Sequence, residues 1–245
     1  MIKKFEFSEI ENSFMDMPEG EPFICSFSGG KDSTIALSMA CERGEKRGLI
    51  HWVDDDSKES AFHFQDLSII KEQAQCIDVP LTITYDLPWR NRMELLRTYK
   101  NFAEQGIKSI VFGDIFVEDS VKLQSILCKM AGLIPRYPIW GKSHPELIKE
   151  INKRRIKPII TRINTSMLSE EWLGKAFNEE VYDAFCSLGI NPFGENGEFH
   201  TTVVDADVYK KAMNYNLCSN EKQEDCVNIN TSVHNRAHKV FKLIE

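Results

Sequence analysis

Three features that would each point to a particular class of protein are missing from this 245-residue sequence. No run approaches the ~20 consecutive apolar residues of a membrane span. The two lysines near the start are followed by no apolar segment, so we expect no secretory signal. There is also no CxxC pair, which predicts no disulfide framework and a reducing, cytoplasmic location. The seven cysteines lie far apart, mostly in apolar runs: Cys25, Cys41, Cys76, Cys128, Cys186, Cys218 and Cys226.

The sequence also lacks a positive charge balance. It has 30 Lys and Arg against 37 Asp and Glu, a net charge of −7, and its pI is near 5.5. An acidic surface repels phosphate backbones, so nucleic acid is not an expected partner. The hydrophobic fraction of 42% and the charged fraction of 27% are ordinary for globular proteins. The length is sufficient for one or two domains with a buried core.

The first half alternates short apolar runs with amphipathic ones. This alternation predicts an α/β fold with a parallel sheet, doubly wound so that helices cover both faces. Ligands bind such sheets beyond the carboxyl ends of the strands. The expected strands are 22–27, 48–53, 81–85 and 107–112, and the expected helices are 32–43, 64–77, 91–104 and 118–131.

The alternation of apolar and amphipathic segments ends near residue 133, where three prolines interrupt the hydrophobic pattern. A helix ending near 153, a strand at 157–163, a helix at 178–188 and a Gly/Asn-rich loop at 191–200 follow. We therefore predict three parts. They are a first α/β domain at 1–132, a second, smaller α/β domain at 133–215, and a polar tail at 216–245.

A glycine-rich hexapeptide joins the first strand to the first helix. Glycines let backbone N–H groups approach an anion, and the helix start adds unpaired N–H donors. Lys31 supplies a full positive charge, while Asp32 fits a Mg²⁺ ion that bridges to phosphates. The spacing differs from that of GxxxxGK[ST] loops. The predicted nucleotide-binding residues are Ser28, Gly29, Gly30, Lys31, Asp32 and Ser33.

Two further strand ends carry candidate nucleotide residues. Asp54 follows the second strand and is a candidate for contact with the adenosine, although a solvated acidic turn explains this segment too. Gly113 follows the fourth strand and would allow close approach of the nucleotide. Asp114 is predicted to bind Mg²⁺ or to cap the next helix, and the sequence does not decide between these roles.

A second cluster of reactive side chains lies in GENGEFHT, residues 194–201. Glu195, Glu198 and His200 can orient an ammonium ion or take a proton from it, so we predict catalytic roles for them. A solvated turn is the alternative. The predicted substrate-binding residues are Asn196, Gly197, Thr201 and, outside this segment, Arg136.

Both segments resemble known families. FSGGKDSTIAL resembles the PP-loop of the ATP pyrophosphatases, and GENGEFHT resembles the [GE]-x-G-E-[YF]-H-T signature of the diphthine–ammonia ligase family and its bacterial relatives. The resemblance implies a five-stranded HUP-type sheet that binds ATP and Mg²⁺. It further implies that a carboxylate is adenylated with release of pyrophosphate, and that ammonia then displaces AMP. The segment 113–116 looks like that of the bacterial relatives.

The function expected from this resemblance is an ATP-dependent amide ligase. Its acceptor would be diphthine, a modified histidine on translation elongation factor, or a bacterial acid that the sequence does not name. No cysteine lies in a recognisable glutaminase motif, so free ammonium is the expected nitrogen source. The alternatives are a PP-loop tRNA-thiolating enzyme and a non-catalytic ATP or AMP sensor. A homodimer is left open.

Overall fold

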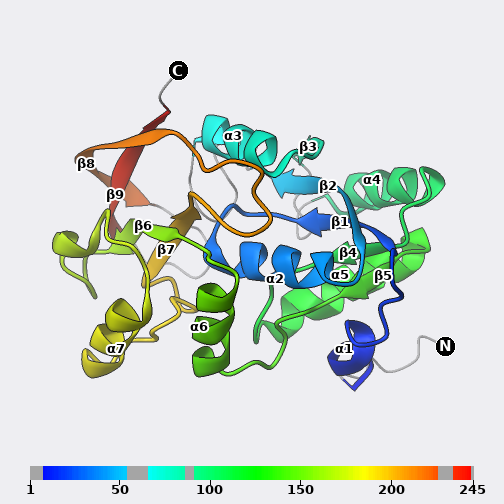
Figure 1. Cartoon of the computed structure of the whole chain (residues 1–245), viewed down its shortest axis with the longest axis horizontal. Coiled ribbons are helices and arrows are strands. Elements are labelled where there is room, and N and C mark those ends of the chain that lie inside the picture. Colours follow the sequence, from blue (N-terminus) through cyan, green and yellow to red (C-terminus); the bar gives the residue numbers. More distant parts are fainter. Residues whose placement is uncertain (1–7, 54–65, 86–90, 226–233, 244–245) are drawn as a thin grey trace. The chain divides into compact units, whose positions relative to one another are not determined.

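The computed structural model describes residues 8–53, 66–85, 91–225 and 234–243. The chain forms two compact units (Figure 1). The first unit comprises residues 1–28 and 32–143, and the second comprises 29–31 and 144–245. Among the described helices, none has both the length and the apolar composition of a membrane span.

A parallel five-stranded sheet forms the centre of the first unit. Its order is β3-β2-β1-β4-β5, so β1 lies between β2 and β4 (Figure 1). Buried apolar residues of β1 and β4 explain why these strands occupy the middle. The strands are β1 (Pro22–Ser26), β2 (Glu45–Trp52), β3 (Leu81–Thr84), β4 (Ser109–Val111) and β5 (Ile134–Arg136).

Helices connect these strands in alternation. The chain first runs outward from β1 to β3 and then returns to β4 and β5. Right-handed crossovers therefore put helices on both faces of the sheet, which confirms the predicted doubly wound α/β class. The helices of this unit are α1 (Ser8–Ser13), α2 (Lys31–Cys41), α3 (Leu67–Ile77), α4 (Arg92–Glu104) and α5 (Glu118–Ala131).

The apolar sides of α4 and α5 meet in one core with the central strands. Tyr99 of α4 and Leu127 of α5 share this core with Ile24 and Ile110. The Tyr99 hydroxyl donates to Gln124 Oε1 at 2.9 Å, so its polar end is satisfied inside the core. Gly132 ends α5 with φ +78°, a conformation that costs glycine little, as the sequence predicted.

The second unit is built on an antiparallel sheet of order β7-β6-β9-β8. The side chain of Asn178 caps α7 by accepting from Val181 N at 3.0 Å. The elements are α6 (His144–Lys153), β6 (Pro158–Asn164), the 3₁₀ helix η1 (Glu170–Trp172), α7 (Glu179–Ser187), β7 (Phe199–Val203), β8 (Tyr215–Asp225) and β9 (His234–Leu243).

The structure changes the predicted division of the chain. The segment after 132 begins with β5, which pairs with β4 and completes the first sheet, so the units separate at 143 instead of 132. The predicted tail at 216–245 contains β8 and β9, and β9 pairs with β6 at Arg162↔His238. The tail is therefore part of the second unit's sheet.

Candidate functional site

The predicted nucleotide loop lies at the point where the strand order of the first unit reverses. β1 pairs in parallel with β4, with Cys25 opposite Val111, so the segments that follow both strands begin side by side. In open α/β sheets this position forms a crevice for ligands. Two hydroxyls meet here: Ser28 Oγ lies 3.1 Å from Ser33 Oγ, and Ser28 N donates to Ser33 Oγ at 3.3 Å.

Gly113 packs directly against the start of α2. A Cβ on Gly113 would lie 2.8 Å from Ser33 N and 2.9 Å from Ser33 Cα, closer than real Cβ atoms approach backbone. The sequence predicted that this glycine admits the nucleotide. The structure shows that it admits the backbone of the nucleotide loop, and contact with the nucleotide itself stays a prediction.

Asp32 and Asp114 are predicted to bind Mg²⁺, and this role stays a prediction. Burial raises the pKa of Asp114 to about 6, the hydrogen bond from Ser120 opposes this rise, and the negative charge of Asp32 adds to it. Carboxylate oxygens are ligands that Mg²⁺, a hard cation, prefers. Within the described residues no three His, Cys, Asp or Glu side chains cluster as a metal site. Asp54 lies outside the described residues.

The middle of the glycine-rich loop packs with the second unit. Val203 N donates to Gly29 O at 2.9 Å, and Lys31 N donates to Thr201 Oγ1 at 3.1 Å. Both partners belong to β7, which continues the GENGEFHT segment. The two sequence motifs are therefore joined by hydrogen bonds. Thr201, predicted to bind substrate, holds the backbone of Lys31, and its contact with substrate stays a prediction.

The side chain of Lys31 points into an aromatic enclosure and is 4% exposed. Its Nζ donates to the carbonyl oxygen of Phe193 at 2.6 Å. The same atom lies 4.8, 5.4 and 5.9 Å from the ring centroids of Phe193, Phe199 and Phe177. We call these three rings and the Phe193 carbonyl the aromatic cage. At such distances an ammonium is attracted by the negative ring faces.

Glu198 organises the loop that precedes β7. Its carboxylate is 1% exposed and accepts from Asn191 N at 3.3 Å, from Asn196 N at 2.9 Å and from Asn196 Nδ2 at 3.2 Å. Gly194 and Gly197 make the accompanying turns with φ of +76° and +83°. Through these contacts Glu198 positions the loop, and Asn196, predicted to bind substrate, is one of its partners. The predicted catalytic role of Glu198 stays a prediction.

His200 does not face the aromatic cage. Successive residues of a strand point to opposite faces of a sheet, and Thr201 and Phe199 point toward Lys31, so His200 points the other way. It lies opposite Arg162 on β6. This geometry argues against a common catalytic cluster of His200 with Lys31. Glu195, also predicted to be catalytic, is partly exposed, and its role in proton transfer stays a prediction.

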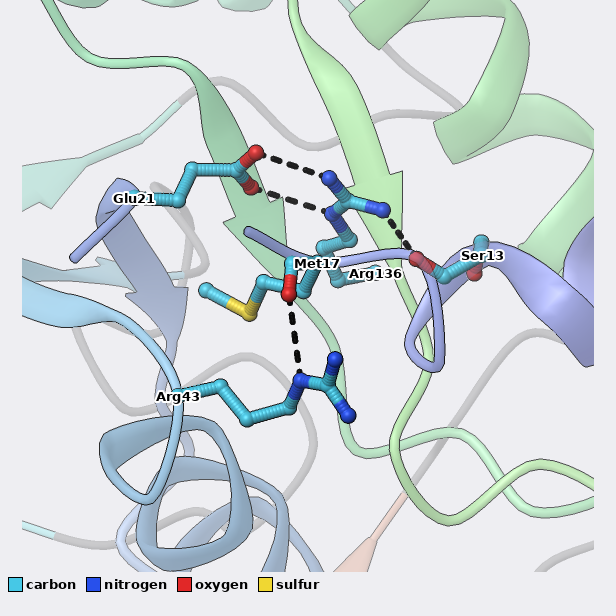
Figure 2. Close-up of polar contacts among 5 residues, drawn as sticks. All are labelled: Ser13, Met17, Glu21, Arg43 and Arg136. Atoms are coloured by element: carbon cyan, nitrogen blue, oxygen red, sulfur yellow. Dashed lines mark hydrogen bonds and ion pairs between the residues drawn. The ribbon is translucent and has the colours of Figure 1, made fainter. Parts of the chain in front are cut away.

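Arg136, predicted to bind substrate, is occupied inside the first unit (Figure 2). Its Nε and Nη2 donate to the two carboxylate oxygens of Glu21 at 3.0 and 2.8 Å, and its Nη1 donates to the carbonyl oxygen of Ser13. Both side chains of the ion pair are buried. The substrate assignment of Arg136 is therefore not supported, because its guanidinium is already used in the fold.

Sequence reasoning missed the aromatic members of the site. Phe193 and Phe199 flank the GENGE turn, and Phe177 stacks obliquely on Phe199 with centroids 5.3 Å apart. The spacing of Phe193 and Phe199 around two glycines was the available signal, but isolated phenylalanines predict only core packing.

Curated relatives match this chain at modest identity. A diphthine–ammonia ligase of Schizosaccharomyces pombe is 25% identical over 208 residues, which cover 75% of this chain and 34% of that protein. Those of Rattus norvegicus and Homo sapiens are 28% and 26% identical over 123 residues, covering 48% of this chain and 45% of each relative. The chain thus spans less than half the length of these relatives.

One solved structure, titled as a predicted subunit of tRNA methyltransferase from Methanocaldococcus jannaschii, covers 78% of this chain and 100% of its own. The identity is 14% and the TM-score is 0.39, so the similarity is weak. The family profiles are more informative. The diphthamide synthase N-terminal domain matches residues 23–135, and the diphthamide synthase C-terminal domain matches residues 143–238. Since both domains occur in order and together span most of the sequence, this chain belongs to the diphthamide synthase family.

Proposed function

We propose that the protein is an ATP-dependent amide ligase. A substrate carboxylate attacks the α-phosphate of ATP, giving an acyl-adenylate and pyrophosphate. Ammonia then attacks the acyl carbon, AMP leaves with the electrons of the broken C–O bond, and a proton is released. The narrow form of the proposal takes diphthine on translation elongation factor as the acid, and the broad form takes another carboxylic acid. Free cysteines among the described residues support a reducing, cytoplasmic setting.

The nucleotide half of the proposal is supported by the first unit. α2 begins within the loop, so the positive end of its helix dipole lies where the β- and γ-phosphates would bind. The hydroxyls of Ser28 and Ser33 lie at the same turn. Asp32 and Asp114 would hold Mg²⁺, which when bound supplies positive charge against the departing pyrophosphate.

The observation that carries the proposal is the hydrogen bonding between the two motifs. Lys31 of SGGKDS donates through its backbone to Thr201 of GENGEFHT and through Nζ to the neighbouring Phe193. An enzyme that activates an acid with ATP and then aminates it needs these two chemistries close together. In this proposal Glu195 accepts the proton that ammonium loses before it attacks.

Pyrophosphate release measures the first step directly. The purified protein would be incubated with Mg²⁺-ATP and a panel of acids, including the host's elongation factor, with and without ammonium. We expect one acid to drive release of AMP and pyrophosphate, and Lys31→Ala or Asp32→Asn to slow it by about 100-fold or more, as losing a transition-state charge contact does.

Three results would contradict the proposal. Release at the wild-type rate by Lys31→Ala and Asp32→Asn would show that the loop does not perform the chemistry. ATP binding without pyrophosphate release across the whole panel would favour a nucleotide sensor instead. Sulfur incorporation into tRNA by the purified protein would favour the thiolation alternative.

A further inference from the structure

The aromatic cage is a built site for an ammonium group. Phe177, Phe193 and Phe199 are each at most 1% exposed, so their rings offer faces from which water is excluded. The Phe193 carbonyl supplies a short hydrogen-bond acceptor at 2.6 Å from the bound nitrogen. Aromatic contacts hold the rings in place: the Phe177 ring meets that of Phe193 edge-on with centroids 5.5 Å apart, and lies tilted against that of Phe199 with centroids 5.3 Å apart.

The chemistry of the cage selects its occupant. Ring faces attract cations that shed water readily, and a carbonyl oxygen accepts from an N–H donor. A sodium ion holds its water more tightly and donates no hydrogen bond. The group that now fills the cage, the Nζ of Lys31, is itself an alkylammonium.

The ammonium group of Lys31 cannot lie in the aromatic cage and contact the phosphates of a nucleotide at the same time. When ATP occupies the loop, several phosphate charges lie at the start of α2, and they attract an ammonium more strongly than uncharged rings do. If the lysine side chain turns to the phosphates, it leaves behind a carbonyl acceptor and three ring faces without a cation.

We propose that the aromatic cage is the binding site for the ammonium ion that the amide ligase consumes, and that Lys31 occupies this site until ATP draws its side chain away. The inference rests on the proposed function for the purpose of the site, but the recognition of ammonium by the cage is testable without any turnover. ATP binding would thereby open the nitrogen site only after the nucleotide is in place.

The binding test uses Lys31→Ala, which removes the part of the side chain that corresponds to n-propylammonium. We expect n-propylammonium chloride to raise the thermal unfolding temperature of this variant in a saturable manner. Sodium chloride at equal ionic strength and uncharged 1-propanol should not do so. Lys31→Met, which fills the same space without a charge, is the matched control and should show no saturable rise.

The absence of a saturable rise in Lys31→Ala, or an equal rise with 1-propanol, would overturn the assignment. Should Lys31→Ala fold poorly, wild-type protein with Mg²⁺ and a non-hydrolysable ATP analogue provides the second measurement. Ammonium chloride should then stabilise the complex more than sodium chloride, and equal effects of the two salts would contradict the displacement of Lys31.

The kinetic test compares two buried phenylalanines. Phe193→Leu removes a ring of the cage, and we expect it to raise the KM for ammonium by about tenfold while the KM for ATP stays within about twofold. Phe185→Leu is the matched control, because Phe185 packs against Phe199 with centroids 5.0 Å apart but lies outside the cage. Equal KM values for ammonium in the two variants would refute the site.

The two proposals can fail separately. If wild-type protein releases no pyrophosphate with any acid, the proposed function fails, while the n-propylammonium experiment still decides whether the cage binds ammonium. If pyrophosphate release is normal but the cage variants respond to ammonium as wild type does, the ligase stands and the cage assignment falls.

Discussion

At the scale of single residues, Asp114 has a pKa that differs clearly from that of a surface carboxyl group. Burial and the nearby charge of Asp32 raise its pKa from 3.8 to about 6. Between these two pH values the folded protein keeps a proton that the unfolded chain has lost. The free energy of unfolding therefore decreases as the pH rises through this window. Above the window the folded protein still bears the cost of a buried, ionised Asp114.

Asp114→Asn should remove this penalty. We expect the free energy of unfolding of the variant, relative to wild type, to increase by on the order of 2 kcal/mol between pH 4 and pH 7. Urea unfolding at several pH values measures the difference. Asp119→Asn is the control, because the side chain of Asp119 is fully exposed. Stability curves of wild type and Asp114→Asn that run parallel across this range would contradict the assignment.

At the scale of elements, the buried ion pair between Arg136 and Glu21 ties the last residue of β5 to the turn before β1 (Figure 2). The same guanidinium reaches the carbonyl of Ser13 at the end of α1. Because β5 is an edge strand, this contact holds α1 beside an otherwise open border of the sheet.

Removing one partner of this pair should destabilise the first unit strongly. Arg136→Met leaves the Glu21 carboxylate buried without its cation, and we expect a loss of about 3–5 kcal/mol in the free energy of unfolding. The double variant with Glu21→Leu should recover much of it. The exposed pair Arg47–Glu45 is the control, and Arg47→Met should cost less than about 1 kcal/mol. Equal losses for both arginine variants would show that burial of the pair is irrelevant.

Elements with a clear apolar period were predictable, and polar or very short ones were not. The helix that ends at Gly132 agrees in both of its bounds, because its amphipathic pattern and its glycine stop coincide. β5 is three residues long and contains Pro135, so it has no strand period. β8 was interpreted as tail, because its sequence YNLCSNEKQED is almost entirely polar and only tertiary pairing makes it a strand.

One part of the candidate site was predictable from the sequence, and another part was not. The loop Ser28–Ser33 was predictable because glycines, a lysine and hydroxyls at a strand–helix junction have a local chemical meaning. The aromatic cage was not, since it depends on Phe177, which is distant in sequence from Phe193 and Phe199, and on the direction in which Lys31 points. Local patterns do not encode which ring faces converge on one atom.

At the scale of the whole molecule, the second unit closes its sheet with the last described segments of the chain. β9 pairs with β6, and β8 pairs with β9, so β6 is a central strand only while β9 is present. A chain ending at Asn214 would expose the backbone N–H and C=O groups of β6 along a new edge. Such edges promote association with other strands.

We expect the truncated protein to lose thermal stability and to form oligomers in light-scattering and size-exclusion measurements. Moderate concentrations of urea should not restore a folded monomer, because the truncated chain lacks β9, the strand whose backbone pairs with β6. A monomeric truncated protein with an unchanged unfolding temperature would show that the hairpin contributes nothing to the second unit.

The three residues Gly29–Lys31 belong to the second unit although they lie within the sequence of the first. A gene fragment that begins at His144 would therefore encode a unit without its own Gly29 and Lys31, leaving Val203 N and the Phe193 carbonyl without the partners they have here. Such a fragment is a poor candidate for recombination into other proteins. The second unit is complete only when both segments are present in the same protein, and a substitution in either segment changes the contacts of the other.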